Sequence, residues 1–146
     1  MMKRVLVATI SILLVAVFAL PGPNLDASAG LFDSPPPTPL QNDDFDNATV
    51  IDGLPFTDAQ DTSTATWASD DPDSCSSNGS VWYTYTPTSD IYVDADTIGS
   101  GFDTVLSAYT GTRGSLEMVP GACNDDWYGL QSRVRFRAIA DTTYYF

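Results

Sequence analysis

Residues 133–138 read Arg-Val-Arg-Phe-Arg-Ala, and this hexapeptide decides the fold class. Successive side chains of a β-strand point to opposite faces, so the alternation puts the apolar residues on one face and the arginines on the other. This pattern predicts a strand with one face against a core and one in water. We interpret the row of Arg133, Arg135 and Arg137 as a solvent-facing strand surface that pairs with Asp residues of neighbouring strands, rather than as a site for an anionic ligand.

Other short runs predict further strands. Residues 91–96, Ile-Tyr-Val-Asp-Ala-Asp, alternate in the same way, and we expect Asp94 and Asp96 to face water. Strands are also predicted, between clusters of Gly, Pro, Asp, Asn and Ser, at 49–51, near 56, and at 64–67, 81–86, 104–110, 116–119 and 142–146. We find no helical periodicity after Asn42, and about seven to nine strands at this spacing predict an all-β, antiparallel β-sandwich. The sequence stops inside an aromatic strand, so we expect a fragment that lacks at least one strand.

Composition removes several classes of function. The chain has 146 residues, no His, six basic and 19 acidic residues and a formal charge of −13. Without His, neither Ser-His-Asp or Cys-His catalysis nor a His-ligated zinc site can form. Glu117 is the single Glu, so a glycosidase would have to use paired Asp residues. An isoelectric point near 4.1 argues against nucleic acid as a partner.

The N-terminus has the pattern of a secretory signal peptide. Lys3 and Arg4 precede an apolar run over residues 5–20, and Ala27-Ser28-Ala29 offers a small-residue cleavage site. The alternative is an uncleaved membrane anchor, for which the run is short. We predict cleavage after Ala29, a secreted bacterial protein, and no membrane contact after cleavage.

The predicted mature chain has two parts. Residues 30–41 form a linker with four prolines in six residues, which favour an extended conformation. Residues 42–146 form the sandwich domain. Once residues 1–29 are removed, all four remaining basic residues are Arg, against 18 acidic residues. Such a surface repels anionic lipid and nucleic acid and suits divalent cations.

Cys75 and Cys123 are the only cysteines. In an exported chain, a single pair usually forms a disulfide, which here would close a loop of about 48 residues and stabilise the fold by about 4 kcal/mol. The alternative is two free thiols, but the sequence offers no His or Lys nearby to form a thiolate.

A series of short motifs, taken in order and spacing, resembles the bacterial pre-peptidase C-terminal domain family over residues 42–146. The motifs are Asn42-Asp43-Asp44-Phe45 with Asn47-Ala48, Ser80-Val81-Trp82-Tyr83-Thr84-Tyr85-Thr86-Pro87, Phe102-Asp103-Thr104-Val105-Leu106 with Tyr109-Thr110-Gly111, Ala122-Cys123-Asn124-Asp125-Asp126, Leu130-Gln131-Ser132-Arg133-Val134, and Asp141-Thr142-Thr143-Tyr144-Tyr145.

The resemblance implies a small jelly-roll-like β-sandwich carried by secreted proteins, without catalytic activity, and with a final strand after Phe146. The collagen-binding domains of clostridial collagenases are related in fold, and calcium orders the segment that leads into them. The sequence departs from this pattern at Leu40 and Gln41, where those relatives carry glutamates, and at Asp141, where relatives usually have Gly.

Two acidic clusters are candidate calcium sites. Asn124, Asp125 and Asp126 follow Cys123 directly, and three oxygen-bearing side chains in a row could contribute to the six to eight ligands that Ca²⁺ takes. The second cluster is the one that the resemblance implies, Asn42 and Asp43, which Asp71 of a nearby acidic loop could complete. In both clusters the alternative is turn chemistry, in which Asn and Asp side chains accept hydrogen bonds from backbone N–H groups.

Trp127 and Tyr128 precede Gly129 in a predicted loop. Exposed aromatic rings there could stack on a sugar ring or a peptide, or Trp127 could fold back over the sandwich. Trp82, Tyr83 and Tyr85 are instead expected in the core. The sequence thus predicts a secreted accessory or binding module, with Ca²⁺ as a candidate cofactor and an extracellular polymer or protein as the partner. A structural spacer and an enzyme using paired Asp residues are the alternatives.

Overall fold

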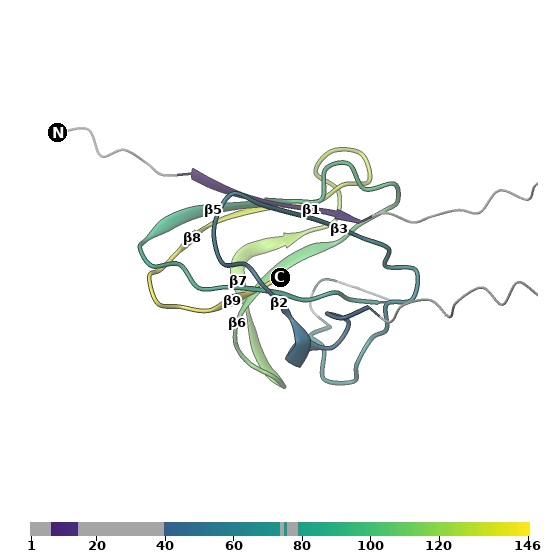
Figure 1. Ribbon diagram of the computed structural model, residues 1–146, viewed down its shortest axis with the longest axis horizontal. Helices are drawn as coiled ribbons and strands as arrows, with labels where there is room; N and C mark the ends of the chain where they lie inside the picture. The colour runs from purple at the N-terminus through teal and green to yellow at the C-terminus, as the bar shows by residue number, and fades with distance from the viewer. Residues whose placement is uncertain (1–6, 15–39, 74, 76–78) are drawn as a thin grey trace, which may run out of the picture.

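The computed structural model describes residues 7–14, 40–73, 75 and 79–146, and these form two β-sheets (Figure 1). One sheet has the strand order β3-β1-β5-β8 and the other has the order β2-β4-β9-β6-β7. The elements are β1 (Val7–Leu14), the 3-10 helix η1 (Phe45–Asn47), β2 (Thr49–Val50), β3 (Phe56–Gln60), β4 (Tyr83–Tyr85), β5 (Ile91–Asp96), β6 (Leu106–Thr112), β7 (Ser115–Asn124), β8 (Arg133–Ala138) and β9 (Tyr144–Tyr145).

The predicted all-β class is confirmed, and the two alternating hexapeptides are strands with the predicted limits, β5 and β8. They pair antiparallel, with Val93 opposite Phe136 and Ala95 opposite Val134. All four of these side chains are buried in one apolar core with residues of the second sheet, such as Tyr83. The pairs β1–β3, β1–β5 and β2–β4 are parallel, so the sheets are mixed rather than purely antiparallel.

Two strand predictions need correction. Residues 64–67 lie in a loop and not in a strand. Gly111 does not end β6, which continues to Thr112 and turns at Arg113 and Gly114 into β7. Gly111 has φ +110°, and a Cβ there would lie 2.5 Å from the Ser115 carbonyl oxygen, so glycine fits where β6 and β7 approach closely and other residues would clash.

Asp94 and Asp96 are not in water, contrary to expectation: they are 2% and 9% exposed. The arginine row explains the burial of Asp94, because Arg133 Nε donates to Asp94 Oδ1 at 2.5 Å and Nη2 pairs with Oδ2. Arg137 pairs with Asp90 at 2.7 Å. The predicted pairing with an Asp of a neighbouring strand is therefore seen for Arg133, whereas the partner of Arg137 lies in the loop just before β5.

The strand β1 falls inside the segment predicted as a signal peptide. It lies between β3 and β5 and runs parallel to both (Figure 1). Ile10 and Ile12 are 0% and 3% exposed and belong to the core. The predicted cleavage site at Ala29 and nearly all of the predicted linker lie outside the described residues.

Cys75 and Cys123 form the predicted disulfide, with their Cα atoms 6.0 Å apart. It ties the segment before β4 to the end of β7, and neither cysteine is a free thiol. Within the described ranges, none of the helical segments has the length and apolarity that a membrane crossing requires.

Candidate binding surface

Two loops meet at one end of the sandwich, at the upper right of Figure 1. Residues 97–105 connect β5 to β6, and residues 125–132 connect β7 to β8. β5 pairs antiparallel with β8, so the end of β5 lies beside the start of β8. β6 pairs antiparallel with β7, so the start of β6 lies beside the end of β7. The two loops therefore begin and end next to each other.

Buried hydrogen bonds join the two loops. The backbone N–H of Thr97 donates to the Ser132 carbonyl at 3.0 Å, and the Ser132 N–H donates to Thr97 Oγ1 at 2.8 Å. The Thr104 N–H donates to the Leu130 carbonyl at 2.9 Å. The side chains of Thr97, Thr104 and Ser132 are at most 3% exposed. Buried, satisfied polar groups of this kind fix loop geometry, so the pair forms one rigid platform.

Exposed apolar side chains gather on this platform. Among the described residues, ten large hydrophobic side chains are exposed, and five of them lie on these two short loops: Ile98, Val105, Trp127, Tyr128 and Leu130. Tyr128 is 71% exposed and Trp127 is 49% exposed. Single exposed apolar residues need no explanation, but a local concentration of them is typical of a binding surface. Both alternatives for Trp127 stay predictions, because its ring is 49% exposed and also lies against Arg133 of β8.

Trp127 is exposed and also braced from behind. The guanidinium carbon of Arg133 lies 4.5 Å from the centroid of its ring, and the Trp127 N–H donates to the Gln131 carbonyl at 2.8 Å. Arg133 is held in turn by the buried carboxylate of Asp94, whose hydrogen bonds raise the pKa of Arg133. A ring fixed in this way loses little conformational freedom on binding, which favours affinity.

Three carboxylates stand beside the aromatic residues. Asp103, Asp125 and Asp126 are exposed, and each offers an oxygen atom within 4.8 Å of the others. Oxygen ligands of one Ca²⁺ ion lie at about 2.3–2.6 Å from the metal, so this spacing fits a shared ion with the other positions left to water or ligand. The sequence prediction included Asp125 and Asp126 but missed Asp103, whose role depends on the contact between the two loops.

Asn124, the third residue of the predicted cluster, makes a hydrogen bond to the neighbouring strand. Its Oδ1 accepts a hydrogen bond from the Arg133 N–H at 2.9 Å, at the point where β7 leads into the loop. This is the turn chemistry that the sequence offered as the alternative. The bond sets the start of β8, and with it the position of the Arg133 side chain behind Trp127.

The side chains of the second predicted cluster, Asn42, Asp43 and Asp71, each form hydrogen bonds to neighbouring groups. Asn42 is 1% exposed and its Nδ2 donates to the Trp82 carbonyl at 3.0 Å. Asp43 accepts from the backbone N–H and the hydroxyl of Thr66, at 2.6 and 2.7 Å. Asp71 accepts from the Ala68 N–H and the Ser80 hydroxyl. Asp43 and Asp71 thus make the hydrogen bonds of the turn alternative, and their metal-binding role stays a prediction.

A separate acidic group surrounds Arg113 at the tip of the β6–β7 hairpin. Arg113 pairs with Asp44, Asp46 and Asp70 at 2.7, 2.8 and 2.6 Å. Its hydrogen bonds hold the pKa of Asp44 and of Asp70 below its usual range, and the carboxylates raise the pKa of Arg113. The contacts link the hairpin to the segment around η1, so this group stabilises the fold.

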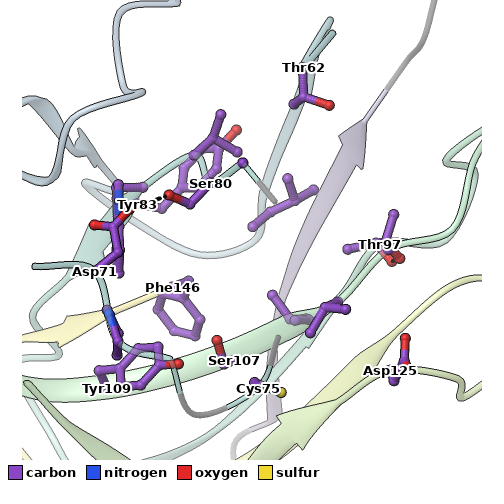
Figure 2. Close-up of a pocket in the computed structure, with 18 of the residues that line it drawn as sticks. Thr62, Asp71, Cys75, Ser80, Tyr83, Thr97, Ser107, Tyr109, Asp125 and Phe146 are labelled. Atoms are coloured by element: carbon purple, nitrogen blue, oxygen red, sulfur yellow. Dashed lines mark hydrogen bonds between the residues drawn. The ribbon is translucent and has the colours of Figure 1, made fainter. Parts of the chain in front are cut away.

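A pocket of about 470 Å³ that is partly open to solvent reaches from core residues such as Tyr83 and Phe146 to the loop platform (Figure 2). Asp71, Asp103 and Asp125 are among its lining residues, and Asp71 lies across from Asp125 in the view of Figure 2. Trp82 also lines the pocket, and its Nε1 is the one buried side-chain polar atom of the described residues without a hydrogen-bond partner. The pocket is therefore lined by both polar and apolar side chains.

No protein-family model matches the chain, and comparisons with curated proteins and with solved structures return no match.

Proposed function

We propose that the chain is a secreted, non-catalytic binding module whose ligand surface is the loop platform, residues 97–105 and 125–132. The observation that carries this proposal is the gathering of exposed apolar side chains on two loops that buried hydrogen bonds hold together. A spacer domain would have no need of a braced and exposed indole ring. The resemblance to pre-peptidase C-terminal domains, with their jelly-roll-like fold, supports the same kind of accessory role.

Extracellular export is part of the proposal. The basic and apolar N-terminus with its small-residue cleavage site supports it, and so does the disulfide, which persists in oxidising compartments. In the mature chain the acidic excess would keep the surface in solution and away from anionic lipid.

The proposed ligand is an uncharged or weakly charged extracellular polymer. Trp127 and Tyr128 offer aromatic area with few rotatable bonds, which suits the face of a sugar ring or a peptide side chain. The carboxylates of Asp103, Asp125 and Asp126 would repel a polyanion at the same place. Binding to nucleic acid is therefore no part of the proposal.

Calcium is the proposed cofactor of this surface. Bound to Asp103, Asp125 and Asp126, the ion would neutralise three like charges and offer its remaining positions to oxygen atoms. All three carboxylates are exposed, so the protein alone provides only part of the coordination shell. We expect weak affinity that rises when a polymer supplies further oxygen ligands.

Retention on insoluble collagen, chitin and cellulose tests the proposal. Trp127→Ala should lower the affinity for the bound polymer about fivefold or more, because a stacked ring contributes about 1 kcal/mol or more. Trp67→Ala is the matched control, since Trp67 is 47% exposed but lies on another loop, and it should retain the wild-type level. Absence of retention on every polymer, or equal losses in both variants, would contradict the proposal and favour a spacer.

A further inference from the structure

The pocket that reaches the loop platform points to the chemical class of the ligand. We infer that this pocket takes one sugar unit of the polymer, so that the polymer bound by the platform is a polysaccharide and not a polypeptide. The inference rests on the proposed function, because the platform would hold the neighbouring units of the same polymer. The pocket volume of about 470 Å³ lies within the range of about 300–1,000 Å³ that is usual for small-molecule sites.

The charged side chains of the lining disfavour an anionic ligand. They are Asp71, Asp103 and Asp125, and neither Lys nor Arg is among the described residues that line the pocket. An anion would therefore meet like charge without a compensating cation. An ionised carboxylate accepts hydrogen bonds and donates none, so a ligand of this pocket needs hydroxyl or N–H donors. Both a neutral sugar and an organic ammonium ion have such donors.

The indole N–H of Trp82 distinguishes between these two classes. Trp82 lines the pocket and is 4% exposed, and its Nε1 is buried without a hydrogen-bond partner among the described residues. Buried polar groups are nearly always hydrogen-bonded, because a donor that is left unpaired costs free energy. A ligand oxygen atom that accepts from Nε1 would remove this cost. An ammonium group has no acceptor atom, whereas a sugar hydroxyl both donates and accepts, so the indole N–H favours the sugar.

Aromatic rings give the same lining apolar surfaces. The aromatic lining residues are Trp82, Tyr83, Phe102, Tyr109 and Phe146. Ser107 adds a hydroxyl group, and Figure 2 shows it pointing into the pocket. Aromatic rings pack against the C–H face of a sugar ring, while the carboxylates, the hydroxyl and the indole N–H serve the hydroxyl groups at its edge.

One wall of the pocket, formed by Asp71, Cys75 and Ser80, is fixed by bonds within the protein. The Ser80 hydroxyl donates to Asp71 at 2.9 Å. Cys75 is bonded to Cys123 of β7, two residues before Asp125, which lies across from Asp71 in Figure 2. The disulfide therefore ties this wall to the strand that leads into the platform. A pocket with fixed walls loses little conformational freedom when a ligand binds, which favours affinity.

NMR of the indole N–H groups of the three tryptophans tests the pocket and the platform separately. The full chain is used, because Ile12 of β1 is one of the lining residues. The ¹⁵N-labelled protein is titrated with cellotriose, chitotriose or maltotriose, and in separate samples with a collagen-like peptide or with spermidine. A trisaccharide that binds should shift the Trp82 signal downfield, as its N–H gains a hydrogen bond, and should also shift the Trp127 signal. Trp67, which lies on another loop, should stay unchanged.

Two variants measure the contribution of the pocket to affinity for the same trisaccharide. Trp82→Phe keeps an aromatic ring and removes the donor, so the dissociation constant should rise about fivefold or more, as expected for one lost hydrogen bond. Ser107→Ala should weaken binding by a similar factor without removing a large side chain, and it serves where thermal melts show that Trp82→Phe does not fold. Trp67→Phe is the matched control and should bind like the wild type.

The outcomes separate the sugar pocket from the platform. Trisaccharide binding that shifts Trp127 and leaves Trp82 unmoved, or wild-type affinity in both pocket variants, would overturn the sugar pocket and leave the platform standing. Binding of the collagen-like peptide or of spermidine in the pocket, without any trisaccharide, would overturn the assignment to a sugar. A shift of Trp82 with Trp127 unmoved would support the pocket and contradict the platform. No shift with any trisaccharide at millimolar concentration would overturn the pocket, while retention on insoluble polymers would still report on the platform.

Discussion

Replacing Arg133 with Met should destabilise the fold far more than the same change at Arg137. The two arginines lie two residues apart on β8 and each pairs with an Asp, but the Asp94 side chain is 3% exposed and that of Asp90 is 45% exposed. Removing the partner of a buried charge costs about 3–5 kcal/mol, whereas an exposed pair contributes about 1 kcal/mol or less. Met keeps the aliphatic stem, so the difference reports on the charge.

Urea unfolding at neutral pH, followed by circular dichroism, measures both variants. Arg133→Met should lose about 3–5 kcal/mol, which corresponds to a fall in Tm on the order of 10–20 °C for a domain of this size. Arg137→Met should lose about 1 kcal/mol or less. Adding Asp94→Asn to Arg133→Met should recover a large part of the loss, since no buried charge then remains. Small and equal losses in the two single variants would refute the claim that Asp94 is a buried charge compensated by Arg133.

Three further predictions concern metal, pH and redox state. In thermal melts, Ca²⁺ at about 100 times its dissociation constant should raise the free energy of unfolding by about 2.7 kcal/mol relative to chelator. Asp125→Asn should abolish this stabilisation, and Asp43→Asn should leave it unchanged. Hydrogen bonds from Arg113 hold the pKa of Asp44 and of Asp70 below the ordinary value of 3.8. This part of the stability is therefore present above pH 3.8 and is lost as the pH falls through the lowered pKa, so Arg113→Gln should reduce the slope of urea stability against pH below about pH 4. Reduction of the disulfide should cost about 4 kcal/mol in the same urea assay, and an unchanged midpoint would contradict this.

Local patterns predicted much of the fold. The hexapeptides that form β5 and β8 could be recognised as strands, because their side chains alternate along the sequence. This alternation also specifies which residues face the core. The disulfide was predicted from a single pair of cysteines in a chain that we expect to be exported. In contrast, the burial of Asp94 depends on a pair with Arg133, 39 positions away, and alternation alone assigns any charged residue to water.

Only part of the candidate site could be predicted from the sequence. Asp125, Asp126, Trp127 and Tyr128 are consecutive, so their pattern could be recognised. Asp103 lies near them only because the two loops pack together. Hydrogen bonds of Thr97 to Ser132 and of Thr104 to Leu130 hold the loops in contact. Sequence periodicity does not reveal a contact of this kind. Asp43 and Asp71 show another case, because these carboxylates, which suggest metal ligands, accept hydrogen bonds from neighbouring N–H and O–H groups. The Asn42 amide donates to the Trp82 carbonyl.

The placement of β1 was also outside the reach of sequence reasoning. An apolar run after Lys3 and Arg4 is typical of a signal peptide, and that prediction stays open for residues 1–29. The same residues 7–14 contain β-branched side chains at alternate positions, which also suits a buried strand. Periodicity alone does not distinguish a signal peptide from a buried strand in a short apolar run. Which of the two forms depends on the residues that pack against the run.

The most direct test of the loop platform as the ligand surface is an NMR titration of the ¹⁵N-labelled protein. The titrant is a soluble fragment of whichever polymer retains the module, added in the presence of Ca²⁺. The platform predicts that the largest amide shift changes fall within residues 97–105 and 125–132, including the indole N–H of Trp127, and that the indole N–H of Trp67 stays unchanged. Shift changes centred on residues 61–73 or on the β6–β7 hairpin, with the two loops unaffected, would contradict it.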